Sequence, residues 1–218
     1  KLVLDPESEG YQLIEGWLAE KGVHTLGILE QGFRQLSNSK KEIVTPEDIK
    51  GMKFRVPQTA ILIDAFDAMG ASASPMSFSE VYTALQQGTI DAQENPLSVI
   101  TSSRFNEVQD YLSMTEHVYS AAPLMVSKAA YDALPEDLQA VVDEAGVEAC
   151  QWEREYLAEV EVQWLDELET AGTQINYPDK APFVDAMSSV YNQFVGDGDD
   201  MVSPELLEQV REIISQVE

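Results

Sequence analysis

The chain has 218 residues, of which 39 are acidic and 13 are basic, so its net charge at pH 7 is -26. This length, with a hydrophobic content of 44%, allows one large or two small folded domains. The negative charge argues against nucleic-acid binding, because a phosphate backbone would be repelled. No apolar run approaches the ~18 residues of a membrane-spanning helix. With one cysteine and two histidines, we expect neither a metal centre nor a cofactor.

Helices and short strands alternate in the N-terminal half of the chain. Apolar residues recur at helical spacing between residues 8 and 21, and Thr45-Pro46 followed by acids is typical of a helix start. Short apolar runs closed by glycine or proline indicate strands. The expected helices span residues 8–21, 46–51, 58–69 and 77–88, with another from Asn95, and the expected strands span 23–29, 53–56, 89–92 and 119–127. This alternation predicts an α/β fold.

A long helix is expected from about residue 135 to 171, where only Gly146 interrupts the pattern. Its apolar residues, which include Leu138, Trp152 and Tyr156, recur every three or four positions, and its other side is mostly acidic. At ~1.5 Å per residue the helix is about 55 Å long, more than the diameter of one small domain. Because it lacks a strict seven-residue seam, we expect it to bridge two lobes rather than form a coiled coil.

The two C-terminal helices, the acidic loop between them and Cys150 are expected to have structural roles only. Helices are expected near residues 181–194 and 204–217. The acidic loop 196–200 lacks the spacing of an EF-hand, so a solvated loop is favoured over a calcium site. Cys150, in the long helix, is expected to be a small buried apolar residue.

Two arginines differ from the other bases in their surroundings. Arg34 follows Gly32-Phe33 at the predicted edge of a turn, and Arg55 lies in the middle of a strand. A buried arginine must meet a carboxylate or a ligand, since an unpaired buried charge is costly. The planar guanidinium matches a carboxylate with two parallel hydrogen bonds. For Arg55, an ion pair with an internal acid and a site for an anionic ligand both remain open.

Four runs of sequence carry a family resemblance. They are GFRQLSN at 32–38, TPEDIKGMKFRVP at 45–57, PMSFSEVYTALQQG at 75–88 and IDAQENPL at 90–97. In this order and spacing, they resemble the solute-binding proteins of tripartite ATP-independent periplasmic (TRAP) transporters. The resemblance extends over essentially the whole chain. Where the family carries Asp-Gly, this chain has Asp91-Ala92, a small change in a turn.

The resemblance implies a two-lobed α/β periplasmic binding protein fold, similar to class II. Residues 1–32 and 121–160 would form what remains of lobe one, and residues 33–120 and 161–218 would form lobe two. The long helix, about 135–171, would be shared by both lobes. Family members begin with a βαβ segment, and this chain starts after roughly its first third, so lobe one is expected to be incomplete.

The resemblance also implies a function. Members are periplasmic receptors that bind a small organic acid in the cleft between the lobes and deliver it to a TRAP membrane permease. Carried over by position, Arg55 would clamp the substrate carboxylate, and Arg34 would be a second cationic contact used by part of the family. Asn95 would donate an amide hydrogen to the same carboxylate, and Phe78 would line the pocket. Tyr119 is a further candidate for the pocket lining.

An enzyme acting on a small carboxylic acid is the alternative. It would need a positioned acid or base with a shifted pKa near Arg55. The motifs offer only Glu80, Asp91 and Glu94, which the resemblance makes structural. The two histidines, His24 and His117, lie outside any nucleophile motif and are also expected to be structural. The sequence therefore favours a receptor over an enzyme and leaves the identity of the acid open.

Overall fold

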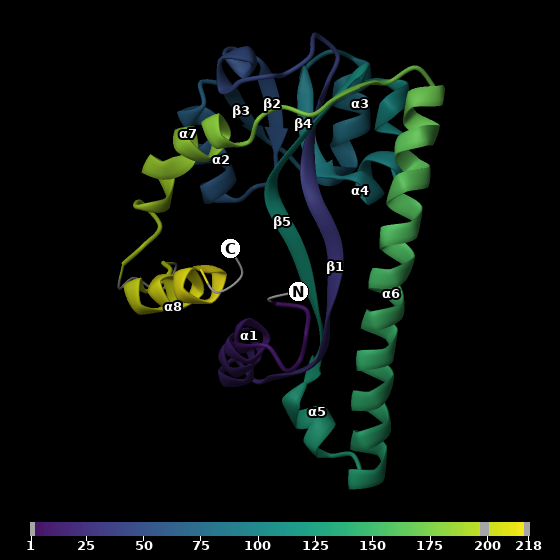
Figure 1. Ribbon diagram of the computed structural model, residues 1–218, viewed down its shortest axis with the longest axis vertical. Coiled ribbons are helices and arrows are strands. Elements are labelled where there is room, and N and C mark those ends of the chain that lie inside the picture. The colour runs from purple at the N-terminus through teal and green to yellow at the C-terminus, as the bar shows by residue number, and fades with distance from the viewer. Residues whose placement is uncertain (1–2, 197–200, 216–218) are drawn as a thin grey trace. The chain divides into compact units, whose positions relative to one another are not determined.

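The computed structural model describes residues 3–196 and 201–215. The chain divides into two compact units. Unit 1 comprises Lys1–Gln31, Ala121–Val160 and Gly196–Glu218, and unit 2 comprises Gly32–Ser120 and Glu161–Val195. The boundaries between the units fall within three elements, namely β1 (Val23–Asn38), β5 (Tyr111–Ser127) and the long helix α6 (Glu136–Thr170). All three are labelled in Figure 1. The long helix expected at about 135–171 is α6, and its sharing between two lobes stays a prediction.

Unit 2 is built on a mixed sheet with the strand order β3-β2-β4-β1-β5-β6. Strand β2 runs parallel to both β3 and β4, β1 is antiparallel to β4, and β5 is parallel to β6. The strands not yet delimited are β2 (Lys53–Val56), β3 (Ser72–Pro75), β4 (Ala92–Pro96) and β6 (Gln174–Asn176). Parallel pairs joined through helices fit the α/β class that the alternating pattern predicts.

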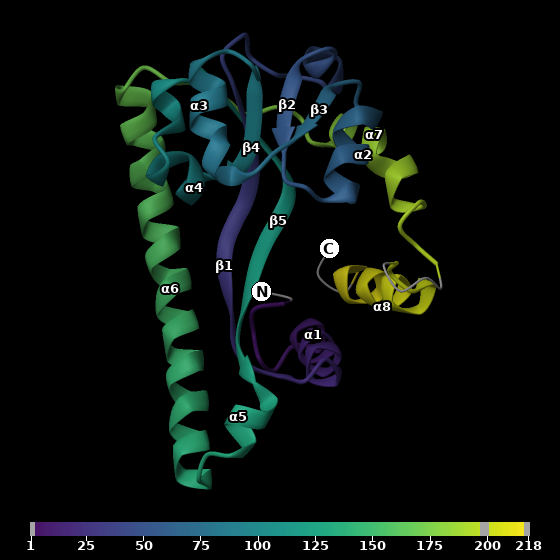
Figure 2. The same cartoon turned by 180° about the vertical axis from the view of Figure 1, so that it is seen from behind.

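Two clusters of buried apolar side chains stabilise unit 2. The first packs α2 (Ala60–Ala68) and α7 (Ala181–Tyr191) against the sheet. Within it, the ring centroids of Phe54 and Phe66 are 4.9 Å apart. The second packs α3 (Val81–Gln86) and α4 (Leu97–Ser102) against β5 and the end of α6 (Figure 2). Shorter elements of this unit are the 3-10 turns Pro46–Ile49, Phe78–Glu80 and Phe105–Glu107.

In unit 1, α6 approaches β1 through two glycines. A Cβ atom on Gly146 would lie 2.6 Å from the backbone oxygen of Leu26, and a Cβ on Gly27 would lie 2.5 Å from Cys150 Sγ. Gly146, which is unfavourable in a helix interior, is therefore required by the close approach of a strand. Cys150 is buried as expected, and burial raises the pKa of its thiol. The other helices are α1 (Glu9–Glu20), α5 (Lys128–Asp132) and α8 (Pro204–Ser215).

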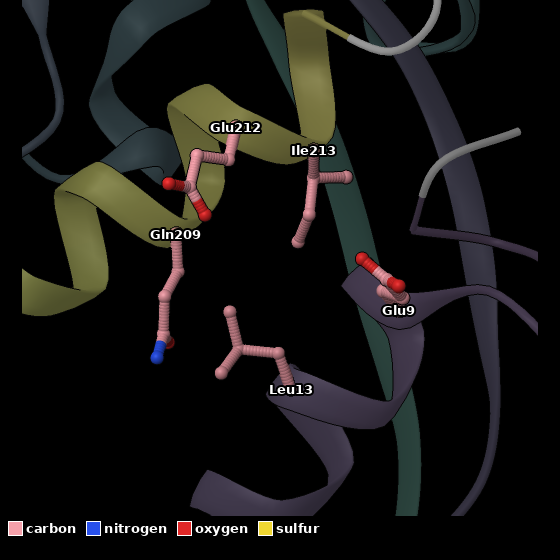
Figure 3. A pocket seen from close by; sticks show the side chains of 5 residues that line it. All are labelled: Glu9, Leu13, Gln209, Glu212 and Ile213. Atoms are coloured by element: carbon pink, nitrogen blue, oxygen red, sulfur yellow. The ribbon is translucent and has the colours of Figure 1, made fainter.

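Helix α8 lies beside α1. A cavity of about 330 Å³ separates them, lined by Glu9, Leu13, Gln209, Glu212 and Ile213 (Figure 3). This contact places Gly196–Glu218 with unit 1, whereas the sequence assigned residues 161–218 to lobe two. The amphipathic pattern of α8 predicts a helix but not the unit against which its apolar side packs. The expected acidic loop falls on residues 197–200, which lie outside the described part of the chain.

Several strand boundaries differ from the sequence prediction. Strand β1 continues to Asn38 rather than ending near 29, so Arg34 lies in a strand and not at the edge of a turn. Strand β4 covers Ala92–Pro96 rather than 89–92, and β5 begins at Tyr111 rather than Tyr119. The short polar strands β3 and β6 were not predicted. With four and three residues they are too short for a pattern to identify, and they form because β2 and β5 offer backbone partners.

The apolar stripe on α6 also differs from expectation. Leu138, Trp152 and Tyr156 are exposed, whereas the buried side of the helix in unit 1 carries Cys150 and Leu157. The helix has two apolar stripes, and the one that contains Gly146 faces the strand. Among the described residues, no helix is both long enough and apolar enough to cross a membrane.

Candidate functional site

Arg55 is a buried cation in the sheet of unit 2. Its strand neighbours Phe54 and Val56 belong to the first core cluster, so alternation along β2 turns Arg55 to the other face. Only 4% of the residue is exposed. Its Nε and Nη2 both donate to Met76 O, at 3.3 and 2.9 Å. In the described part of the chain, no carboxylate forms an ion pair with this guanidinium.

The environment of Arg55 disfavours its charge. Burial lowers the pKa of Arg55, Glu94 at longer range opposes this effect, and Arg34 adds to it. An arginine nevertheless stays protonated at neutral pH. The two hydrogen bonds to Met76 use two of its five N–H groups, which leaves hydrogens on Nη1 and Nη2 for a further acceptor. A carboxylate on this edge would restore the solvation that burial removes.

Phe78 lies next to this guanidinium. The Arg55 Cζ is 5.8 Å from the centroid of the Phe78 ring, a distance typical of a cation–π contact. Phe78 also packs at 6.1 Å against Phe105 of the second core cluster, yet 48% of its surface is exposed. The ring is thus fixed on one side and open on the other.

Arg34 is neutralised within the chain. Its Nε and Nη2 donate to the two carboxylate oxygens of Glu94, with Nη2 at 2.7 Å from Oε1. Nη2 also donates to Glu94 O at 2.9 Å and to Asn95 Oδ1 at 3.1 Å. The Glu94 side chain is fully buried and that of Arg34 is 13% exposed. The contact is a buried, two-point ion pair, the strong form of this interaction.

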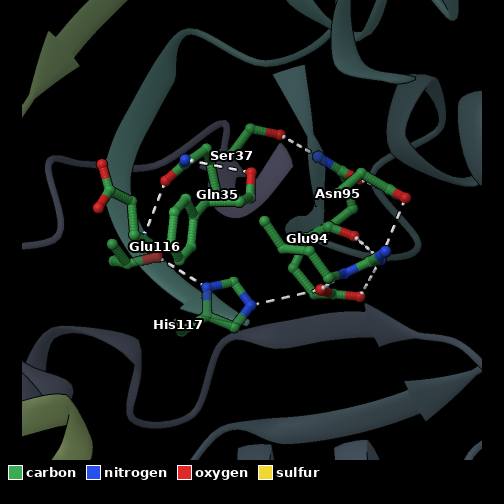
Figure 4. A network of polar contacts seen from close by, with 10 residues as sticks. Gln35, Ser37, Glu94, Asn95, Glu116 and His117 are labelled. Atoms are coloured by element: carbon green, nitrogen blue, oxygen red, sulfur yellow. Dashed lines mark hydrogen bonds and ion pairs between the residues drawn. The ribbon is translucent and has the colours of Figure 1, made fainter. Parts of the chain in front are cut away.

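His117 is the second partner of Glu94. Its Nε2 lies 3.3 Å from Glu94 Oε2, and its Nδ1 lies 2.8 Å from Thr115 Oγ1 (Figure 4). A proton on Nε2 would donate to Glu94, and Thr115 holds the other ring nitrogen. Burial alone would raise the pKa of Glu94, but the hydrogen bonds from His117 and Arg34 outweigh it and lower the pKa. Glu94 is therefore a carboxylate at neutral pH.

Neutral amides and a hydroxyl continue from this pair across the sheet. Asn95 Nδ2 donates to Gln93 Oε1 at 2.6 Å, and Gln93 Nε2 donates to Ser37 Oγ at 2.8 Å. Gln35 Oε1 accepts the backbone N–H of Glu116 at 3.0 Å (Figure 4). The strand register sets Gln93 opposite Arg55 and Asn95 opposite Gln35. One face of the sheet thus carries Arg55 together with neutral hydrogen-bonding side chains.

A family model described as bacterial extracellular solute-binding protein, family 7, matches residues 7–197. The chain belongs to this family.

Two relatives show the similarity in sequence. A solute-binding protein of Verminephrobacter eiseniae is 42% identical over 193 residues, which are 88% of this chain and 56% of that protein. The 2,3-diketo-L-gulonate-binding periplasmic protein YiaO of Escherichia coli is 38% identical over 182 residues, 83% of this chain and 56% of YiaO. The chain therefore spans just over half the length of these relatives.

A solved structure shows the same fold. The crystal structure of a TRAP periplasmic solute-binding protein from Roseobacter denitrificans with bound L-galactonate matches with a TM-score of 0.81 at 35% identity. The match covers 96% of this chain and 67% of that one. These findings confirm the resemblance to TRAP solute-binding proteins and the α/β class of the fold.

Four of the candidate residues form two contacting pairs. Arg55 meets Phe78, and Arg34 meets Asn95. The fifth candidate, Tyr119, is half-buried, and its ring packs edge-on at 5.1 Å against Phe33. All five lie in unit 2. Sequence position alone grouped them, and the strand register places Arg55 and Asn95 on one face of the sheet and Arg34 on the other, from where its side chain reaches Asn95.

Two residues of the site were interpreted from the sequence as merely structural. Glu94 pairs with Arg34, and His117 is a second partner of Glu94. No sequence signal identified Glu94, because the predicted strand ended at residue 92 and so did not include it. His117 gave no such signal, since its distance to Glu94 depends on how β5 and β4 are placed in the sheet.

Proposed function

We propose that this solute-binding protein captures a small organic acid through Arg55, in the periplasm, and delivers it to a TRAP membrane permease. The observation that carries the proposal is the guanidinium of Arg55, which is buried beside Phe78 and has no carboxylate partner among the described residues. A buried cation without a counter-ion is unfavourable by several kcal/mol. An acid ligand would remove that cost, which gives the site a thermodynamic preference for carboxylates.

The other candidate residues receive roles that fit their contacts. Asn95 Nδ2 carries two hydrogens, and its bond to Gln93 uses one. The second would donate to the ligand carboxylate beside Arg55. The open side of the Phe78 ring would cover the ligand, and Tyr119 would add a second aromatic surface. Arg34 would act on the ligand through the side chain of Asn95, whose oxygen it holds.

The relatives support an acid of this kind. YiaO is named for 2,3-diketo-L-gulonate, and the Roseobacter denitrificans protein was crystallised with L-galactonate. Both ligands are polyhydroxylated acids with one carboxylate. We propose the same class of ligand for this chain.

An enzyme fits the site less well. Glu94 is the buried acid nearest to the candidate residues, and both of its oxygens are held by Arg34 and His117. Those bonds lower its pKa, so it is a poor proton acceptor at neutral pH and a poor proton donor. A receptor needs no such group. A turnover assay over the acids that bind is expected to show no product.

Replacing the guanidinium of Arg55 by the ammonium group of a lysine tests the proposal. Arg55→Lys is expected to weaken binding of L-galactonate or 2,3-diketo-L-gulonate by ~2–4 kcal/mol, because an ammonium cannot make two parallel hydrogen bonds. Isothermal titration calorimetry measures the change. Arg104→Lys is the matched control, since Arg104 is exposed and pairs with Glu107. Wild-type affinity in the Arg55 variant would show that another group holds the carboxylate.

A further inference from the structure

A chain of hydrogen bonds connects Asn95 to other buried polar side chains of unit 2. Asn95 Oδ1 accepts from Arg34 Nη2 at 3.1 Å, and Asn95 Nδ2 donates to Gln93 Oε1 at 2.6 Å. Gln93 Nε2 donates to Ser37 Oγ at 2.8 Å, and Ser37 Oγ donates to Gln109 Oε1 at 3.3 Å. Asn95, Gln93, Ser37 and Gln109 are each no more than 5% exposed. Ser37 and Asn95 are labelled in Figure 4.

The two ends of this chain fix its direction. The guanidinium of Arg34 can only donate a hydrogen bond. At the other end, Gln109 Nε2 donates to the backbone carbonyl oxygens of Val108 at 2.9 Å and Asp91 at 3.4 Å, which can only accept. Turning the amide of Asn95 by 180° would bring two donors together, and turning that of Gln109 would bring acceptors together. The chain therefore runs one way, from the guanidinium to the carbonyls.

The strand register brings the members of the chain together. Ser37 of β1 is the direct partner of Gln93 in β4, and Asn95 follows Gln93 on the same face of the sheet, which is also the face of Arg55. Gln109 lies just before β5, the strand beside β1. Buried polar side chains are costly unless they are fully hydrogen-bonded, and a fully bonded network holds its members in one arrangement.

We propose that Ser37 and Gln109 position the side-chain amide of Asn95 so that its nitrogen, and not its oxygen, is presented to the ligand. This inference rests on the proposed function, in which Asn95 donates to the ligand carboxylate, and deepens it with two positioning residues that do not touch the ligand. Gln93 is the link between them and Asn95.

Each bond of the chain has a defined effect on the next. Gln109 takes the hydroxyl hydrogen of Ser37, which leaves a lone pair of Ser37 Oγ for Gln93 Nε2. With its nitrogen held there, Gln93 turns Oε1 toward Asn95 and accepts one Nδ2 hydrogen. The other Nδ2 hydrogen then has a fixed direction. An amide oriented before binding loses less conformational entropy when the ligand binds, and an oxygen in that place would repel a carboxylate.

Removing the hydroxyl of Ser37 tests the proposal. In Ser37→Ala, Gln93 Nε2 loses its acceptor, so Gln93 can turn either end of its amide toward Asn95. Calorimetric titration with L-galactonate and with 2,3-diketo-L-gulonate is expected to show binding that is weaker by about 3- to 10-fold, the usual effect of one hydrogen bond. Ser37→Thr keeps the hydroxyl and should bind within about 2-fold of wild type. Ser188→Ala, at an exposed serine of unit 2, is the matched control and should leave binding unchanged.

A double-mutant cycle distinguishes positioning from a general structural role. If Ser37 acts through Asn95, then Ser37→Ala should change the affinity by less than about 2-fold when Asn95→Ala is already present. A merely structural serine would weaken binding by the same factor in both backgrounds. If Ser37→Ala does not fold, Gln109→Met takes its place in the cycle, because it removes the acceptor of the Ser37 hydroxyl.

The outcomes separate this inference from the proposed function. If Ser37→Ala weakens binding equally with and without the Asn95 amide, or if neither Ser37→Ala nor Gln109→Met changes the affinity, the positioning role is wrong and the receptor function stands. If Asn95→Ala binds like wild type while Arg55→Lys does not, Asn95 is no ligand contact and the inference alone fails. If wild-type protein binds neither acid, the proposed function fails, and the inference fails with it.

Discussion

The two units of the chain differ in how completely they bury their apolar side chains. Both core clusters of the described residues belong to unit 2. In unit 1, the part of α6 before Val160 exposes apolar residues at helical spacing, with Trp152 63% and Tyr156 49% exposed. Their rings are stacked at 5.2 Å, 8° from parallel. Unit 2 therefore closes its own core, while unit 1 leaves an apolar surface open on one helix.

This difference shows that the side chains of a site can be held in fixed positions in one unit while the other unit exposes apolar residues to water. The Arg34–Glu94 pair and Arg55 depend on strand register and on the two clusters that fix β1, β2 and β4. None of these contacts involves the exposed stripe of α6, defined here as Leu138, Val141, Ala145, Ala149, Trp152 and Tyr156. An exposed apolar stripe of this kind is typical of a surface that another chain segment or another molecule covers.

The largest contrast is expected between core and stripe substitutions. Phe54→Ala, at a fully buried position of unit 2, should lower the free energy of unfolding by ~3–5 kcal/mol through lost burial and a residual cavity. Trp152→Ala, in unit 1, should change it by no more than ~0.5 kcal/mol, because the ring is already in contact with water. Urea denaturation followed by circular dichroism measures both.

Equal losses from the two substitutions would contradict the comparison. They would mean that Trp152 is covered in solution. Val162→Ala is the control, since Val162 lies on the same helix in unit 2 and is 69% exposed. It should resemble Trp152→Ala.

The exposed stripe of α6 should also promote self-association of the protein. The expected change in the free energy of association is smaller than the loss of folding stability in Phe54→Ala. The net charge of -26 opposes contact between copies at low salt, and screening reduces this repulsion as the Debye length falls from ~10 Å at 0.1 M to ~3 Å at 1 M salt. Replacing Trp152 and Tyr156 together by glutamine should weaken association at high salt by at least ~10-fold, or ~1.4 kcal/mol. Sedimentation velocity at several protein concentrations gives the constants. Association that is unchanged by this double substitution would assign it to another surface.

Much of the fold could be predicted from the sequence, because local patterns carry it. The capped helices, the glycine-closed strands and the length of α6 depend on neighbours in sequence. The orientation of α6 could not be predicted, since it has two apolar stripes and only the requirement for Gly146 at the strand decides between them. Strands β3 and β6 were missed for a related reason, because their pairing partners are distant in sequence.

Part of the candidate site could also be predicted from the sequence, and part could not. Arg55 was identifiable as a cation in a strand with no adjacent acid, and the prediction left open whether an internal acid would pair with it. The structure gives the acid to Arg34 instead. That assignment follows from the register, which sets Leu36 opposite Glu94 and Arg34 opposite Pro96. No local pattern specifies which of two arginines an acid on a third strand will reach.

The smallest expected effect on the free energy of unfolding comes from two aspartates. One accepts hydrogen bonds from the backbone and the other does not. In unit 2, Asp48 accepts from Lys41 Nζ at 2.8 Å and from the backbone N–H groups of Val44 and Thr45 at 3.0 and 2.9 Å. These bonds, the one from Lys41 first, lower the pKa of Asp48 to about 2 from 3.8. In unit 1, Asp132 pairs with Lys128 at an exposed position, 2.8 Å from its Nζ, and with no other described residue.

Asp48→Asn is expected to lower the free energy of unfolding by ~1 kcal/mol at neutral pH, as for loss of a helix cap. Because the folded pKa lies below the unfolded one, this contribution is present above pH 3.8 and disappears as the pH falls toward 2. Denaturation of variant and parent between pH ~7 and ~2.5 should show their difference shrinking over that window. Asp132→Asn should cost only ~0.3–0.5 kcal/mol, because an exposed ion pair is worth little. A difference for Asp48→Asn that is constant with pH, or no larger than that of Asp132→Asn, would show that the backbone hydrogen bonds of Asp48 do not stabilise unit 2.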